Sequence, residues 1–321
     1  MSKTKKQHYV PQAYLNKFSF GKKKINVFDK ENNKLLYKQD IKNFAEQNYF
    51  YDIDLQYLKN HLKEVPEDLQ KALDSYSDEE LAYLEQYIEH QLAKTENKIL
   101  PIINKIIKDA EKATPFYIKQ CYCMSEEDKE WMGIYLTIQD IRTLKKRNQI
   151  RKQYDDWRNQ HLSIISEIRR VHNIKEPIKT DCTQKCNIDK SKYLHLGQMI
   201  ELLSNSKKIY YSTSVFRDKL WVIFINKTNK TFWTSDAPIV GDDFGARFFP
   251  LNSSIVLCVL ERVLYEKLFD NELSTMNVKD RIYQYLYNTD FVYLLNKFQL
   301  EQCNRFVFAC DSSLERLVIK E

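Results

Sequence analysis

The sequence has little glycine and proline. Only 5 Gly and 7 Pro occur in 321 residues. So few turn-forming residues favour long helices and strands over tight turns. Nucleotide-binding cradles built from glycine-rich loops are not expected, and the chain contains no P-loop, dinucleotide-binding glycine motif, HExxH or Gly-x-Ser-x-Gly sequence.

Long apolar runs are also missing. No stretch approaches the roughly 18 uninterrupted apolar residues of a membrane span. The basic residues 1–6 are not followed by the apolar segment of a secretory signal. The 7 Cys are an odd number in a long chain, which suits a reducing compartment better than a disulfide framework. We therefore expect a cytoplasmic protein with no membrane partner.

The excess of charge is small. Lys and Arg number 50 against 44 Asp and Glu, so the net charge is +6. This allows weak attraction to nucleic acid but does not demand it. The composition, 43% apolar and 29% charged, is that of a folded protein and not of a disordered chain.

The first half of the chain predicts a β-hairpin followed by helices. Residues 24–29 and 34–38 are β-prone runs on either side of two Asn residues. A capping box at Ser77 predicts one helix start, and Ser125, followed by three acidic residues that suit a first turn, predicts another. The second helix is expected to continue past Trp157. Pro101 is expected to kink or split the helix before it.

The second half is predicted to be mainly β. Strands are expected at residues 220–226, 231–234, 246–250, 255–260, 290–295 and 305–310, helices at 194–206 and 278–287, and a loop at 176–190. A helical middle between two strand-bearing ends predicts an α+β fold, with the helices packed against β-strands contributed by the N-terminal and C-terminal parts. We expect one domain over residues 1–321, with a β-hairpin region at 1–54, a helical region at 55–210 and a mainly β region with one or two helices at 211–321.

Several motifs are spaced along the chain. They are His8-Tyr9-Val10-Pro11 with Tyr14, Leu15 and Phe18; Glu96; Gln139-Asp140-Ile141-Arg142-Thr143; Ser235-Asp236-Ala237-Pro238; Phe249-Pro250-Leu251; and Asn277. In this order, over nearly the whole chain, they resemble the uncharacterised family called domain of unknown function 4238. The family often has a second His where this chain has Gln7, so a two-His metal pair is not expected there. The resemblance implies one fold and marks these positions as important, without implying an activity.

Five of these positions could carry out chemistry. His8 could act as a general acid or base, or be a buried His bonded to a carbonyl. Gln139 and Arg142 share a helix face, where they could hold a phosphate and orient water. Alternatively, Arg142 could tie the helix to Asp236 in a structural ion pair. Asp236 follows a strand, as many active residues do, or it could simply close an Asx-turn. Glu96 could join His8 and Asp236 around a divalent metal, Mg²⁺ or Mn²⁺.

The remaining motif residues are expected to be structural. Pro11 fixes the local backbone, and Tyr14 can anchor the opening segment to a core. Ser235 and Pro238 would shape the turn around Asp236, and Asn277 precedes the penultimate predicted helix.

A basic tract gives the best candidate surface for a polyanion. It consists of Lys145, Lys146, Arg147 and Arg151, expected on the same helix as Arg142 and followed by Tyr154 and Trp157. These residues could bind a nucleic-acid substrate, with the aromatic side chains stacking on bases. The alternative is an ordinary solvated helix face.

The cysteines form two close pairs. Cys121 and Cys123 are separated by one residue, and Cys182 and Cys186 by three. A four-thiolate zinc site would need both pairs, but neither has the usual spacing of two. Unrelated free thiols are favoured.

Two functions remain open. The first is a hydrolase acting on a phosphate-bearing substrate, specifically a nuclease in host (anti-phage) defence, with the five chemical positions at its site. The second is a non-enzymatic module that binds nucleic acid or protein and whose polar motifs form a structural network.

Overall fold

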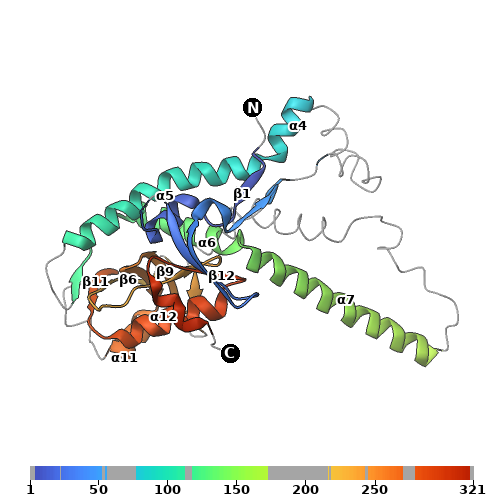
Figure 1. Cartoon of the computed structure of the whole chain (residues 1–321). Coiled ribbons are helices and arrows are strands. Elements are labelled where there is room, and N and C mark those ends of the chain that lie inside the picture. The colour runs from blue at the N-terminus through green and yellow to red at the C-terminus, as the bar shows by residue number, and fades with distance from the viewer. Residues whose placement is uncertain are drawn as a thin grey trace.

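The fold is a six-stranded sheet between two helical layers, with a second, smaller sheet beside it (Figure 1). The computed structural model describes residues 4–21, 23–52, 55, 77–112, 118–172, 216, 218–242, 245–269 and 279–318. The predicted loop at 176–190 and helix at 194–206 lie outside them. None of the described helices is long and apolar enough to cross a membrane.

The strands form three sheets. The six-stranded sheet has the order β5-β11-β6-β10-β9-β8, and only the β11–β6 pair is parallel. The four-stranded sheet has the order β3-β2-β12-β7, and β1 pairs with β4. The strands are β1 Lys6–His8, β2 Lys24–Asp29, β3 Lys34–Asp40, β4 Glu46–Asn48, β5 Ile118–Gln120, β6 Leu220–Asn226, β7 Thr234–Ser235, β8 Val240–Gly241, β9 Arg247–Asn252, β10 Ile255–Leu260, β11 Arg281–Leu286 and β12 Phe306–Ala309.

The helices cover both faces of the six-stranded sheet. They are α1 Gln12–Leu15, α4 Asp78–Glu85, α5 Tyr87–Lys112, α6 Glu126–Ile141, α7 Leu144–His172, α11 Arg262–Phe269 and α12 Thr289–Gln302, with 3-10 turns at Asn16–Phe18, Ile41–Asn43 and Ser312–Leu317. Alternate β6 residues face opposite layers. Trp221 packs with the α5 and α6 side chains, and Val222 packs with those of α11 and α12. Because both faces are covered, β6 is apolar from Leu220 to Ile225 and shows no alternation of apolar and polar residues.

The small sheet joins the two ends of the chain. Strand β12 pairs with β2 of the N-terminal hairpin on one side and with β7 on the other. The α+β prediction, with a helical middle packed against strands from the N-terminal and C-terminal parts, is confirmed.

Helix starts were predicted better than helix ends. The capping box predicted at Ser77 is present, and the predicted start at Ser125 is formed by a capping box as well. The helix from Ser125, however, ends at Ile141, with Arg142 as its C-cap, and α7 begins at Leu144, so the prediction of one continuous helix was wrong. Helix α5 runs through Pro101, and the break in this region lies instead at Gln86.

Two C-terminal assignments were reversed. Residues 281–286 form strand β11 and not a helix, and residues 289–302 form helix α12 where a strand was expected over 290–295. The β11 residues Ile282 and Tyr283 are buried against opposite helical layers, and this two-sided burial overrides the local pattern. Asn288 is the N-cap of helix α12, and its side chain accepts a hydrogen bond from the backbone N–H of Asp290.

Candidate functional site

The opening motif is fixed to the core by its aromatic side chains. Tyr14 is fully buried; its hydroxyl donates to the carbonyl of Pro250 and lies 2.8 Å from the Thr234 hydroxyl. Its ring stacks on Phe249, with 4.9 Å between centroids. Pro11 immediately precedes α1. These contacts leave the backbone of His8 and Tyr9 facing the end of α6.

The end of α6 binds that backbone through two side chains. Gln139 Nε2 donates to the Tyr9 carbonyl at 2.9 Å. Arg142 donates to the same carbonyl through Nε (3.0 Å) and to the His8 carbonyl through Nη2 (3.2 Å). Its Nη1 forms an ion pair with Glu96 of α5 at 2.8 Å. One guanidinium thus joins α5, α6 and the opening motif.

Arg142 is sealed within this network. Its exposed fraction is 1%, so a substrate cannot reach the guanidinium without local opening. Burial alone would lower the pKa of Arg142, but the neighbouring Tyr51 and Glu96 raise it above its ordinary value. Arg142 therefore carries a permanent buried charge that Glu96 compensates.

Asp236 lies in a separate network, and the predicted Arg142–Asp236 ion pair is wrong. The buried Asp236 carboxylate accepts hydrogen bonds from the backbone N–H groups of Asn304 (2.8 Å), Arg305 (2.9 Å) and Phe306 (3.1 Å). Burial raises the pKa of Asp236 to about 6, although these three bonds favour the ionised form. Asp236 thus fixes the turn that leads into β12.

The neighbours of Asp236 form a second turn, at residues 235–238. Ser235 Oγ donates to the carbonyl of Ala237 at 3.0 Å and accepts from its N–H. The carbonyl of Pro238 accepts from Gln299 Nε2 at 2.9 Å, which ties the turn to α12. Asn277 lies outside the described residues.

The groups open to solvent near Arg142 are acidic and imidazole side chains. His8 is partly exposed, and its Nε2 lies 3.3 Å from the carbonyl of Lys42. Burial lowers the pKa of His8, while Glu46 and Glu96 act in the opposite direction. Glu89 was missed from the sequence, and burial raises its pKa to about 7. The signal that could have identified Glu89 is its position two helical turns before Glu96.

The predicted metal cluster is not assembled. Among the described residues, no group of three or more His, Cys, Asp or Glu side chains is placed to hold a metal ion. His8 and Glu96 lie in the Arg142 network, whereas both carboxylate oxygens of Asp236 accept backbone hydrogen bonds elsewhere. Of the proposed zinc ligands, Cys182 and Cys186 lie outside the described residues.

The basic tract lies on α7 and not on the helix of Arg142. Arg147 is buried, and its guanidinium donates to the backbone carbonyl of Phe50 at 2.6 Å. The guanidinium carbon also lies 3.5 Å from the centroid of the Phe50 ring. These contacts fix the first turns of α7 to the core. Lys145 and Lys146 are partly buried, and Arg151 is exposed. Only part of the tract is therefore open to a ligand.

The family assignment agrees with this arrangement. A family model described as "Protein of unknown function (DUF4238)" matches residues 6–313. No curated protein and no solved structure matches the chain. The match covers both networks, from the opening motif to the turn after α12. The chain therefore belongs to the DUF4238 family.

Proposed function

We propose that this protein binds nucleic acid through helix α7, and that the networks around Arg142 and Asp236 are the scaffold that carries this helix. The observation behind the proposal is the distribution of charge. Helix α7 has eight Lys or Arg residues and three Asp or Glu residues, which gives +5 of the chain's net +6. The rest of the chain is close to neutral.

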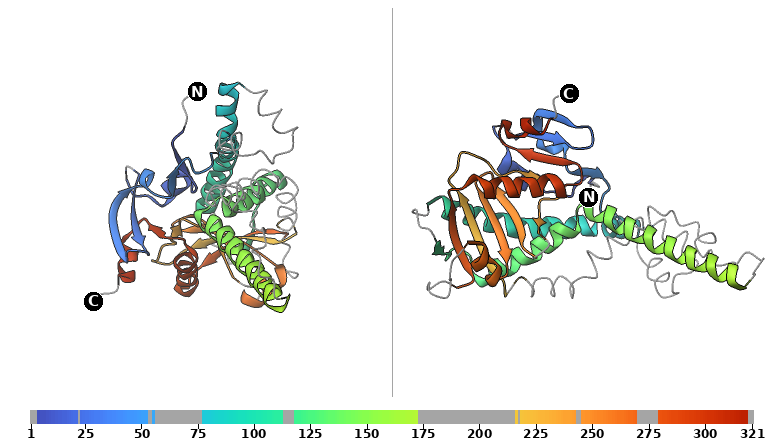
Figure 2. Two further views of the ribbon diagram at one scale, coloured as in Figure 1. Left: turned by 90° about the vertical axis from the view of Figure 1, so that its right-hand side faces the viewer. Right: turned by 90° about the horizontal axis from the view of Figure 1, so that it is seen from below.

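The position of α7 suits a polyanion. Figures 1 and 2 show α7 extending away from the sheets, so that its later turns project from the body of the protein. Arg151 and Lys152 are exposed, and Trp157 is 54% exposed. Cationic side chains bind phosphates with release of counterions, and aromatic rings can stack on unpaired bases. This favours a single-stranded nucleic acid as the ligand.

The motif residues are better suited to support than to catalysis. Arg142 and Asp236 are buried, and each is bonded to backbone groups of a neighbouring segment. Buried side chains with such backbone partners stabilise the fold. The same geometry argues against a phosphate-binding role for Arg142.

A hydrolase is the second candidate, and one observation favours it. The carboxyl of Glu89 has a pKa of about 7, and the charge of Glu96 acts to raise the pKa of both Glu89 and His8. A carboxyl with a pKa near neutrality and a partly exposed imidazole can serve as general acid and base in catalysis. Combined with α7 binding, such a pair would make a nuclease, for which we propose a role in anti-phage defence.

We also place the protein in the cytoplasm. The five cysteines within the described residues are all free thiols. Free thiols, two of them partly exposed, are typical of a reducing compartment.

A charge-reversal experiment tests binding. Arg151→Glu/Lys152→Glu is compared with Lys108→Glu/Lys112→Glu, which reverses two exposed lysines of α5 and changes the net charge equally. Affinity for labelled single-stranded DNA and RNA is measured at several salt concentrations. The α7 variant should bind more weakly, with the slope of log Kd against log salt reduced by about 1.4, because each phosphate contact on a single strand contributes about 0.7 and two are lost. Equal weakening by both variants would refute a role specific to α7.

The hydrolase is tested separately on the same oligonucleotides with Mg²⁺ or Mn²⁺. His8→Ala and Glu89→Gln should each abolish cleavage while leaving the affinity unchanged. Cleavage that survives both substitutions, or no cleavage by the wild type, would exclude these residues as the acid–base pair.

A further inference from the structure

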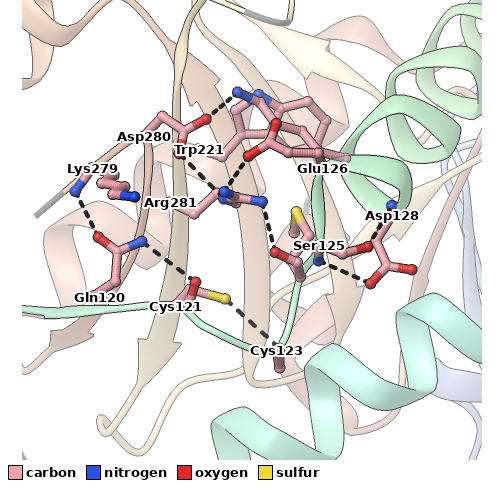
Figure 3. A network of polar contacts seen from close by, with 12 residues as sticks. Gln120, Cys121, Cys123, Ser125, Glu126, Asp128, Trp221, Lys279, Asp280 and Arg281 are labelled. Carbon is pink, nitrogen blue, oxygen red and sulfur yellow. Dashed lines mark hydrogen bonds and ion pairs between the residues drawn. The ribbon is translucent and has the colours of Figure 1, made fainter.

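Two cysteines lie in the short link between β5 and α6, at the opposite end of α6 from Arg142. Cys121 directly follows β5, and its N–H donates to the carbonyl of Arg281 in β11 at 2.9 Å. Two residues after Cys123, Ser125 caps α6. Figure 3 shows the Cys121 side chain directed toward Cys123, with a dashed line marking their contact, among the polar contacts of this link. The backbone on both sides of the pair is therefore held in place.

The two sulfur atoms interact directly. Cys121 Sγ lies 3.7 Å from Cys123 Sγ, and Cys123 Sγ lies 3.0 Å from the hydroxyl of Tyr283. That hydroxyl donates to Asp109 at 2.6 Å. The hydrogen bond from Cys123 lowers the pKa of Cys121 to about 7. The cation of Lys105 also interacts with both sulfurs and favours a thiolate.

The sulfurs differ in access to solvent. Cys121 is buried, and Cys123 is partly exposed. Tyr122 between them is 82% exposed, so its side chain does not tie the link to the core. A disulfide bond is about 2.05 Å long, so the sulfurs would have to approach by about 1.6 Å. The link can provide this movement while its ends remain fixed.

We propose that Cys121 and Cys123 are a redox-active dithiol, which a low-molecular-weight disulfide oxidises reversibly to an intramolecular disulfide. Cys121 first loses its proton to solvent. The partly exposed Cys123 sulfur then attacks the small disulfide as its own proton passes to the Cys121 thiolate, and the departing small thiolate takes up a proton from solvent. One small thiol leaves, and Cys123 is held as a mixed disulfide. Cys121 then loses its proton to solvent and attacks the Cys123 sulfur, which releases the second small thiol. In sum, two protein thiols and one small disulfide give one protein disulfide and two small thiols.

The test uses the full-length reduced protein and glutathione disulfide as the probe. After incubation, free thiols are alkylated and the protein is digested with trypsin. Residues 120–129 form one tryptic peptide that contains only these two cysteines, and Cys310 lies alone in the peptide of residues 306–316. Cys310 is also partly exposed and serves as the internal control. In most of the 120–129 peptide neither cysteine should be alkylated, and its mass should be two hydrogens below that of the reduced, unalkylated peptide. Cys310 should stay largely alkylated under the same conditions.

Two variants separate the roles of the sulfurs. Cys121→Ser should accumulate the mixed disulfide on Cys123, and Cys123→Ser should leave Cys121 unmodified. The proposal is overturned if the wild-type peptide keeps both alkylation sites, or if it accumulates the mixed disulfide as Cys121→Ser does. The wild-type peptide map shows whether the disulfide forms even if a variant fails to fold.

Discussion

Replacing Arg142 with Met tests whether the central network is structural. The substitution removes the donors to the carbonyls of His8 and Tyr9 and the partner of Glu96. Breaking a buried ion pair costs about 3–5 kcal/mol of the free energy of unfolding. The Glu96 side chain is 25% exposed and regains water, which favours the lower end of this range. Tyr9 keeps its bond from Gln139, so only the His8 carbonyl adds about 1 kcal/mol. We expect a loss of about 3–4 kcal/mol, which is a large share of a typical stability of about 5–15 kcal/mol.

Urea unfolding followed by far-UV circular dichroism measures this loss. Gln139→Ala is the matched control, because it removes one neutral donor to the same carbonyl and should cost about 1 kcal/mol. Glu96→Gln keeps an acceptor for Arg142 but leaves a buried cation without its counter-charge. The double variant Arg142→Met/Glu96→Gln should therefore lose less than the sum of the two single losses.

The reasoning fails if Arg142→Met costs no more than Gln139→Ala. It also fails if the double variant is additive, since the Arg142–Glu96 pair would then contribute nothing. Affinity for nucleic acid, measured well below the melting temperature, should be unchanged in Arg142→Met. Loss of binding in a fully folded variant would point instead to contact between Arg142 and the ligand.

Three further predictions concern single side chains. The pKa of Glu89 is raised to about 7, so its ionisation costs the folded state up to about 3 kcal/mol, and stability falls as the pH rises from about 4.5 to 7. The variant Glu89→Gln should therefore have a higher melting temperature than wild type at pH 8 but not at pH 4. Equal melting temperatures at pH 8 would contradict this. Asp236→Ala leaves three backbone N–H groups unpaired and should lose about 3 kcal/mol or more in urea unfolding, whereas a loss below about 1 kcal/mol would mean that water replaces the carboxylate. Tyr14→Phe removes a buried hydroxyl bonded to the Pro250 carbonyl and should cost about 1–2 kcal/mol, with unchanged stability as the refuting result.

Elements with a strong local signal could be predicted from the sequence. Strands β6 and β10 were predicted with their observed bounds, because each is a short apolar run next to polar turn residues. The starts of α4 and α6 were found from Ser77 and Ser125, whose capping bonds involve only residues three positions away.

Elements that depend on distant contacts could not be predicted. Strand β11 was predicted as part of a helix over residues 278–287, and it forms a strand because it lies between β5 and β6. Likewise, nothing local to Arg142 indicates that its partner is Glu96, 46 positions earlier on another helix, and not Asp236. The Cys121–Cys123 contact shows the reverse case, since its spacing was visible but was interpreted as unrelated thiols.

The small sheet has a consequence for the order of folding during synthesis. Strand β2 leaves the ribosome early, but its neighbour β12 pairs with it through Asp29 and Phe306. At a synthesis rate of roughly 5–20 residues per second, some tens of seconds pass between the synthesis of the hairpin and that of β12. During that time the β2 edge, which carries the buried Val27 and Phe28, is open to pairing with other chains. Chaperone dependence of this protein in cells should therefore be set by the last strand of its small sheet.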